Sequence, residues 1–380
     1  HLRGGKSMLK LPLIKTPDPN FEEFKKVVKG EKKAEKVHFA ELFPDPEIVS
    51  AVTEMLGEKS VFPLYSVPSG FEDLKAKKNY LKQWINFWYK MGYDYVTIIG
   101  TEISGLNFPR KSRKAEDTAL IPRKNRDWVE EGKGIITSWK DFEKYSWPDP
   151  EKLDYSLYEF VSKNLPDGMA MMVCPSSGVF EITSEFLLGF EGLSYLLYDQ
   201  PDLVEAVFNK VGDTLCRFYK NVVDIDKVGG FFQGDDMGFN TSTIVSPEIL
   251  RRLVLPWHKK FAAIAHEHNK MYWLHCCGNV LSLMEDLIED VKIDAFHSFQ
   301  DTIIPVVQFK KSYGNRVGTL GGVDVDKLCR LDEVNLRKYV RGILDECMPY
   351  RYALGSGNSI ANYVPVENYL IMLDEGLKWK

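Results

Sequence analysis

Short apolar runs recur along the chain, and each is followed by a stretch in which apolar residues have helical spacing. The runs are mostly continuous rather than alternating, which is typical of strands buried on both faces of a parallel sheet. Eight such runs predict strands at 37–43, 93–100, 169–174, 229–233, 271–276, 293–298, 316–321 and 351–355. Strands and helices therefore alternate along the sequence.

Helix signals stand between these runs. The segment 46–56 has Asp45 as its expected N-cap and Pro46 in its first turn, and 246–268 begins with Ser246 and a proline. The segment 71–91 has apolar and aromatic residues at helical spacing. Each of these segments is predicted to be a helix.

Eight βα units over about 340 residues fit an α/β fold, the (β/α)₈ TIM barrel. A doubly wound open sheet is the alternative, but no GxGxxG turn follows the first predicted strand. We expect one barrel domain over 8–380, with a helical extension before the first strand. Residues 1–7, which precede Met8, are expected to be an expression scar.

The segment 101–167, after the second predicted strand, is too long for a simple link and has its own aromatic and charged content. We predict that it is a lid insertion over the mouth of the barrel. A peripheral hairpin and helix without a role in the site is the alternative.

Composition narrows the class of protein. The 380 residues are 44% hydrophobic and 27% charged, with a net charge of -5, which excludes a disordered or fibrous chain. An acidic balance disfavours nucleic acid, and no apolar run is long enough to span a membrane. Six cysteines are too few for a disulfide scaffold. We therefore expect a cytoplasmic protein with neither nucleic acid nor membrane as a partner; the oligomeric state is open and includes a homodimer.

In a barrel of this kind the active site is built from the loops that follow the strands. Polar residues fall at most of the predicted strand ends: Glu41, Thr101, Glu102, Asp235, Asp236, His275, Cys277, His297, Gln300, Asp301, Asp324 and Asn358. The pattern predicts that these side chains converge at one edge of the sheet.

The sharpest motif is WLHCCGN, in which His275 and Cys277 are two residues apart at a strand end. Side chains two apart on an extended segment point the same way, so an imidazole and a thiolate can hold one ion. This pair suits Zn²⁺ better than Mg²⁺ or Ca²⁺. The alternative is a small buried cysteine beside a hydrogen-bonded core histidine.

Adjacent acids in QGDDMG form a second candidate. Asp235 and Asp236 follow a strand directly and can ligate a metal, act as general acid or base, or cap a turn. The sequence does not separate their roles. Glu181 is a weaker candidate, since a carboxylate that opens a helix is often only a partner of the helix dipole.

Two further features are less specific. The segment GSGNS, which contains Asn358, can form a backbone nest for an anion. His258, His266 and His268 fall inside a predicted helix and are expected to be packing or exposed residues rather than ligands.

The motifs GDDMGFNTSTIVSPEILRRLVLPWHKKF, HCCGN, IDAFHSFQD, VGTLGGVDVDKL and GSGNSIANYVPVENYL together resemble the uroporphyrinogen decarboxylase superfamily. Within it the chain is similar to the cobalamin (corrinoid)-dependent methyltransferases, and closest to the aromatic O-demethylase branch. The resemblance covers nearly the whole chain and implies a TIM barrel. The decarboxylase branch carries an Arg-rich RQAGR segment near its N-terminus, which is absent here.

The methyltransferase branch implies zinc bound by an HxC pair, matched by His275 and Cys277, with an acid after the next strand, where Gln300 or Asp301 stands. A further Cys is expected near the last strand, where this chain has Asn358. An oxygen ligand would then complete the sphere, Asp236 foremost, with Glu181 or Glu41 as alternatives.

The same resemblance implies an aromatic substrate pocket. We assign substrate binding to the residues Glu41, Glu181, Phe239, Phe299, Asn358 and Tyr363. Phe232 is expected to pack in the core instead. Asp236 and Asp235 are assigned as the catalytic acids.

The implied activity is methyl transfer from a small-molecule donor, an aromatic methyl ether foremost, to Co(I) of a corrinoid protein, with zinc or an acid assisting the leaving group. Two alternatives stay open. One is a metal-free decarboxylase or lyase in which Asp235 and Asp236 orient the substrate. The other is a ligand-binding barrel without catalytic activity.

Overall fold

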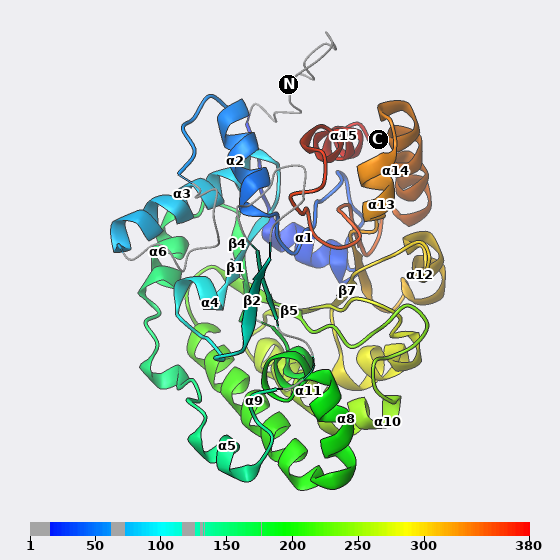
Figure 1. Ribbon diagram of the computed structural model, residues 1–380. Helices are drawn as coiled ribbons and strands as arrows, with labels where there is room; N and C mark the ends of the chain where they lie inside the picture. Colours follow the sequence, from blue (N-terminus) through cyan, green and yellow to red (C-terminus); the bar gives the residue numbers. More distant parts are fainter. Residues whose placement is uncertain (1–15, 62–72, 116–125, 130–131, 133, 176) are drawn as a thin grey trace.

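The structure, a computed structural model, describes residues 16–61, 73–115, 126–129, 132, 134–175 and 177–380 (Figure 1). Its strands are β1 (Tyr95–Ile99), β2 (Ser112–Ala115), β3 (Arg126–Val129), β4 (Ala170–Cys174), β5 (Val228–Gly234), β6 (Met271–His275), β7 (Ala295–His297), β8 (Gly318–Leu320) and β9 (Tyr352–Ala353).

The α-helices are α1 (Phe21–Val28), α2 (Pro46–Met55), α3 (Leu74–Lys90), α4 (Gly100–Ile103), α5 (Trp139–Lys144), α6 (Ser156–Asn164), α7 (Val179–Glu181), α8 (Phe190–Asp199), α9 (Pro201–Val222), α10 (Pro247–Leu253), α11 (Leu255–Glu267), α12 (Val306–Tyr313), α13 (Val325–Arg330), α14 (Glu333–Cys347) and α15 (Val366–Leu377). Short turns of 3₁₀-helix (η1, Pro150–Lys152; η3, Leu281–Leu283) and π-helix (η2, Ile182–Leu187; η4, Asp286–Val291) complete the elements.

Seven strands form one parallel sheet in the order β1-β4-β5-β6-β7-β8-β9. Each strand pairs with the next in parallel register, as in Phe232 with Trp273 and His275 with His297. Helices lie between successive strands and around the curled sheet (Figure 1). Seven of the eight predicted strands are therefore confirmed, and the arrangement is consistent with a TIM-like barrel.

The strand predicted at 37–43 is wrong, because the structure has only a single bridge there, between Phe39 and Leu354. On one side Ala40 N–H donates to the Leu354 carbonyl over 2.8 Å. On the other side the Tyr95 hydroxyl takes the place of a backbone partner: it accepts from Glu41 N–H and donates to the Glu41 carbonyl. A side chain cannot extend a backbone ladder, so this segment lies between β9 and β1 without becoming a strand.

Helix α1 confirms the predicted N-terminal extension and closes the amino-terminal edge of the sheet. Phe21 N–H donates to the carbonyl of Gly168, just before β4, and Arg351, just before β9, donates its N–H to α1. From this edge the Phe24 ring stacks on His38 and contacts the rings of Tyr95 and Trp273 at 5.9 and 5.6 Å. The interior at this end is therefore filled by aromatic side chains.

The other helix predictions are confirmed with one difference. Helices α2 and α3 occupy the predicted segments, although Asp45 makes no cap bond and instead accepts from the N–H of Asn362. The helix predicted at 246–268 is divided into α10 and α11 at Val254. Pro256 explains the division, since proline has no N–H to continue the helical ladder.

The predicted lid at 101–167 is described only in part, because 116–125, 130–131 and 133 lie outside the described residues. Its described part contains α4, the antiparallel pair β2–β3, α5 and α6. All of these elements lie between β1 and β4 in the sequence. Gly134 and Ile136 donate their N–H groups to the carbonyls of Leu188 and Leu187. The covering role of this segment stays a prediction, and the proposed scar at 1–7 also lies outside the described residues.

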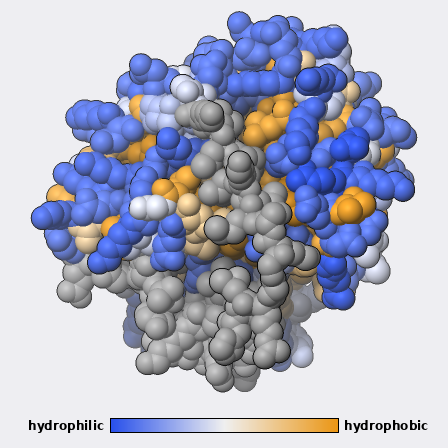
Figure 2. Space-filling model, turned by 90° about the horizontal axis from the view of Figure 1, so that it is seen from above, coloured by the Kyte–Doolittle hydropathy of each residue, from blue (hydrophilic) through white to orange (hydrophobic). Residues whose placement is uncertain are grey.

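The face of the molecule seen from above is mainly hydrophilic (Figure 2), in agreement with the 27% of charged residues in the sequence. Seen from above, hydrophilic side chains dominate the outline, with hydrophobic residues gathered toward the middle of that face (Figure 2). None of the helices described is long and apolar enough to cross a membrane.

The aromatic plug at the amino-terminal edge should be a main source of stability. Phe24→Ala removes a fully buried ring that contacts four other rings, so we expect a loss of about 3–5 kcal/mol in the free energy of unfolding. Urea denaturation measures this loss. Phe239→Ala, at a ring that is 64% exposed, is the control and should change stability by less than about 0.5 kcal/mol.

Candidate metal centre

Three predicted side chains meet at the carboxyl edge of the sheet. His275 ends β6, Cys277 follows it by two residues, and Asp236 follows the end of β5, which pairs with β6. One ligand atom from each lies within 4.8 Å of the other two. His275 Nε2 is 3.3 Å from Cys277 Sγ and 3.7 Å from Asp236 Oδ1. The register of two neighbouring strands therefore builds a compact N, S, O donor set.

His275 presents a neutral imidazole to this group. Burial lowers the pKa of His275 to about 4, so the ring carries no charge near neutral pH. Its Nδ1 lies 2.7 Å from Nδ1 of His297, which is held at its own Nε2 by the Ser356 carbonyl, 3.2 Å away. Nε2 of His275 is therefore the nitrogen that faces the other two donors.

The Cys277 sulfur has polar neighbours. Asn358 Nδ2 donates to Sγ over 3.1 Å, and Ser298 Oγ lies 3.8 Å away. The Cys277 N–H donates to Asp236 Oδ1 over 2.7 Å, which fixes that carboxylate beside the sulfur. Burial and the Asp236 charge raise the pKa of the Cys277 thiol well above its usual value. A cation at this position would therefore stabilise a thiolate that is otherwise protonated.

Three acidic groups at or after the ends of strands have raised pKa values. Burial and the charges of Asp236 and Asp235 raise the pKa of Glu181 well above its usual value, and burial raises the pKa of Glu102 to about 8. Burial also raises the pKa of Asp236. With a pKa of about 8, Glu102 is able to donate a proton near neutral pH, and the raised pKa of Glu181 favours its protonated form.

The structure separates the two adjacent acids. Asp235 is buried, and its oxygens accept from the N–H groups of Phe180 and Glu181 and lie 2.8 Å from His258 Nε2. A Cβ at Gly178 would lie 2.1 Å from Asp235 Cγ, so the glycine permits this approach. Asp235 thus links helix α7 to His258 on helix α11. Of the two acids, only Asp236 belongs to the metal group.

Several predicted residues surround a neighbouring pocket of about 480 Å³. Phe299, Asn358 and Tyr363 line it, and Asn358 also contacts the Cys277 sulfur. Phe239 lies apart from that lining and is 64% exposed. Phe232 packs on Trp273 and His297, as expected of a core residue. The pocket therefore adjoins the metal group through Asn358, which lines the pocket and contacts the Cys277 sulfur.

Other candidates have structural partners instead. Glu41 is buried and accepts from both the N–H and the hydroxyl of Ser356. Asp301, where an acidic ligand is expected, accepts from the Lys327 ammonium and the Tyr339 hydroxyl. Neither residue is in the metal group.

Two N–H groups of the GSGNS segment already have partners within the protein. Ser356 N–H is bound by Glu41, and Gly357 N–H donates to the Val323 carbonyl. Among the predicted helix histidines, His258 is buried between Asp235 and Tyr272, and His266 and His268 pair with Asp294 and Asp224. All three histidines lie outside the metal group.

Sequence reasoning placed His297 at a strand end but assigned it no role, and it passed over Ser298. The sequence does contain a signal for the contact between His275 and His297. The two histidines are 22 residues apart, and each ends one of two neighbouring parallel strands. Their register sets the two imidazoles side by side.

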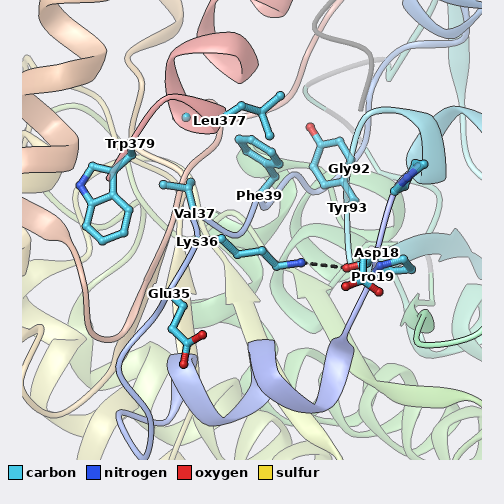
Figure 3. Close-up of a pocket in the computed structure, with 12 residues that line it drawn as sticks. Asp18, Pro19, Glu35, Lys36, Val37, Phe39, Gly92, Tyr93, Leu377 and Trp379 are labelled. Atoms are coloured by element: carbon cyan, nitrogen blue, oxygen red, sulfur yellow. Dashed lines mark hydrogen bonds between the residues drawn. The ribbon is translucent and has the colours of Figure 1, made fainter. Parts of the chain in front are cut away.

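A second cavity lies at the opposite edge of the sheet. Its volume is about 110 Å³, and Figure 3 shows Phe39, Tyr93 and Lys36 facing it, with the Lys36 ammonium donating to the Asp18 carbonyl. It shares no residue with the metal group. The candidate metal ligands thus lie at the carboxyl edge of the sheet, away from this cavity.

Comparison with solved structures agrees with this fold. A methyltransferase from Methanosarcina mazei matches with a TM-score of 0.67 and 14% identity, over 94% of this chain and 98% of that one. A B12-independent methionine synthase from Shewanella sp. W3-18-1 is more distant, with a TM-score of 0.47 and 12% identity over 80% of this chain and 87% of that one. At this level of identity the likeness concerns the fold alone.

No curated protein matches the chain. The family model described as uroporphyrinogen decarboxylase (URO-D) matches residues 132–378, which include β4 to β9 and every member of the metal group. The chain therefore belongs to the uroporphyrinogen decarboxylase (URO-D) family.

Proposed function

We propose that this protein is a methyltransferase that takes a methyl group from the oxygen of a small aromatic ether and passes it to a corrinoid protein. The observation that carries the proposal is the grouping of Asp236, His275 and Cys277 beside the pocket that Asn358 joins to it. Family membership and the fold shared with the Methanosarcina mazei methyltransferase support it.

The donor set fits zinc. Metal–ligand bonds of 2.0–2.3 Å in a tetrahedral site separate neighbouring ligand atoms by about 3.3–3.8 Å. The separations of His275 Nε2 from Cys277 Sγ and from Asp236 Oδ1 are 3.3 and 3.7 Å. A neutral imidazole and a sulfur favour zinc over hard cations, and three protein ligands leave one position for a substrate.

Zinc bound here would act as a Lewis acid toward the donor oxygen. In the overall reaction the carbon–oxygen bond breaks, its electron pair stays on the oxygen, and the acceptor supplies the pair that binds the methyl group. The oxygen then needs a proton. Glu181, whose pKa is raised by burial and by the charges of Asp236 and Asp235, and Glu102, whose pKa is raised to about 8, are the residues that we propose as donors.

The neighbouring pocket suits a small ring. Phe299 is buried in its wall and Tyr363 is 45% exposed at its rim, so the two offer an apolar face and a polar edge. Asn358, shared with the metal group, would stand between ring and metal. We propose these three as substrate contacts and retain Glu181 as an acid rather than a ring contact.

The URO-D match keeps decarboxylation as a second candidate, since the family model is named for that activity. In that case Asp236 would orient a carboxylated substrate without metal, since Asp235 is buried and bound to Phe180, Glu181 and His258. Release of CO₂ in the absence of any corrinoid distinguishes the two reactions.

Metal content and methyl transfer test the main proposal together. We expect about one zinc per chain and methylation of cob(I)alamin with guaiacol or veratrole as donor. His275→Ala should lose both, because it removes one of three ligands. His266→Ala, at a half-buried surface histidine paired with Asp294, is the matched control and should keep both. Retention of metal and rate by His275→Ala would show that the assignment is wrong.

Zinc affinity should rise with pH. The Cys277 thiol has a raised pKa and must lose its proton to bind, so we expect the zinc Kd to fall about tenfold per pH unit between pH 6 and 8. His275, with a pKa near 4, adds nothing in this range. Calorimetry in buffers of different ionisation enthalpy measures the released proton. Cys277→Ser should bind zinc weakly, and a pH-independent wild-type Kd would contradict the prediction.

Glu102 should make the protein less stable as pH rises. Its pKa is raised to about 8 in the folded state from 4.5, so the folded state holds a proton that the unfolded chain releases between these values. The free energy of unfolding should fall by an amount on the order of 2 kcal/mol between pH 5 and 8. Glu102→Gln removes this component, which urea denaturation at both pH values measures. Equal slopes in variant and wild type would refute it.

A further inference from the structure

A continuous chain of contacts leads to the proposed metal ligand His275 from behind, through Glu41, Ser356 and His297, which the proposed chemistry does not use. Glu41 Oε1 and Oε2 accept from the N–H and hydroxyl of Ser356, each over 2.6 Å. The Ser356 carbonyl lies 3.2 Å from His297 Nε2, and His297 Nδ1 lies 2.7 Å from His275 Nδ1. Glu41, Ser356, His297 and His275 are all buried.

These contacts determine which nitrogen of His275 carries its hydrogen. A carbonyl oxygen only accepts, so His297 Nε2 carries a hydrogen and donates it to Ser356. In a neutral ring the other nitrogen, Nδ1, is then an acceptor, and His275 Nδ1 must be the donor in the contact between the rings. His275 Nε2 is left with a free lone pair, directed at Cys277 Sγ and Asp236 Oδ1.

The acid at the far end holds more than one support of the centre. Glu41 is itself fixed by the Tyr95 hydroxyl, which bonds to both its N–H and its carbonyl. By binding Ser356 twice, Glu41 fixes the segment that also carries Asn358, whose amide donates to the Cys277 sulfur. One buried carboxyl group therefore orders the contacts to two of the three metal-group side chains.

Glycines make room for this arrangement. A Cβ at Gly355 would lie 1.7 Å from the Ala40 carbonyl oxygen, and one at Gly321 would lie 2.2 Å from the Ser356 carbonyl oxygen and 3.0 Å from the His297 ring. Gly321 also has a φ of +82°, which other residues rarely adopt. The approach of Ser356 to both Glu41 and His297 depends on the absence of these side chains.

We propose that Glu41 and His297, linked through Ser356, are positioning residues that hold His275 in the metal-binding tautomer and order the Asn358 contact to Cys277. The inference rests on the proposed metal centre, and it replaces the predicted role of Glu41 in substrate binding. Partners behind a metal-bound histidine commonly change metal affinity by 10–100-fold when removed.

The test compares two substitutions at His297 in the full chain. His297→Gln keeps an acceptor for His275 and a donor for Ser356, whereas His297→Leu keeps neither. We expect zinc affinity, measured by competition with a chromophoric chelator, to fall 10–100-fold in His297→Leu and by less than about fivefold in His297→Gln. Equal affinity of the folded Leu variant and wild type would overturn the proposal.

A second measurement needs no metal. Two-bond ¹H–¹⁵N correlations of the histidine rings in the metal-free protein report the tautomer directly. We expect a hydrogen on Nδ1 of His275 in wild type and in His297→Gln, and loss of this preference in His297→Leu. An Nε2 hydrogen on His275 in wild type would overturn the proposal. Wild type that shows the Nδ1 tautomer but binds no zinc would instead refute the metal centre of the proposed function and leave the positioning contact supported.

A pair at Glu41 covers the case in which His297→Leu does not fold. Glu41→Gln retains both contacts, because the Ser356 hydroxyl can accept from the amide, while Glu41→Ala removes both. We expect zinc affinity to fall about tenfold in Glu41→Ala and to stay near wild type in Glu41→Gln. Wild-type affinity in folded Glu41→Ala would show that Glu41 does not act on the centre.

Discussion

The contact between the buried imidazoles of His275 and His297 is the interaction on which the candidate centre depends. It exists because β6 and β7 are parallel neighbours in a register that pairs these two residues at their carboxyl ends. Burial keeps both rings neutral, since it lowers the pKa of each. A neutral pair can share one hydrogen bond without repulsion, and this leaves one nitrogen of His275 for other chemistry.

The rest of the centre follows from the same sheet. Gly234 on β5 pairs with His275, and the chain then turns so that Asp236 lies beside Cys277. Asp235, one residue earlier, points the other way and holds α7 and α11 in place. Adjacent acids with opposite orientations therefore join the centre to the helices that surround the sheet.

Much of this could be predicted from the sequence. Continuous apolar runs gave seven of the strands, and the rule that parallel strands end at one edge brought Asp236, His275 and Cys277 together. These successes depend on local pattern. The division of a predicted helix at Pro256 was also a local signal, but the prediction of 246–268 used only the start signals at Ser246 and the proline that follows it.

Other features depend on contacts between distant residues. Glu41 and Ser356 are 315 positions apart, so a strand-end acid looked like a substrate contact although it is bound within the protein. Asp235 could not be told from Asp236, because its partner His258 lies on a helix whose orientation no local pattern fixes. The prediction of the first strand was wrong for the same reason. The hydroxyl of the distant Tyr95 bonds to both the N–H and the carbonyl of Glu41, so these groups do not pair with a strand.

The aromatic side chains packed beneath α1 bear on how ligands would enter and leave the protein. Phe24, Tyr95 and Trp273 are packed into the amino-terminal end, and His275 lies at the carboxyl end of β6. In a methyl transfer at this centre, the donor and the acceptor would both approach His275 from the carboxyl edge of the sheet. A small donor would have to enter before a whole protein docks over it, and the demethylated product would have to wait until that protein departs. Under the proposed function, the donor would therefore bind first and the product would leave last.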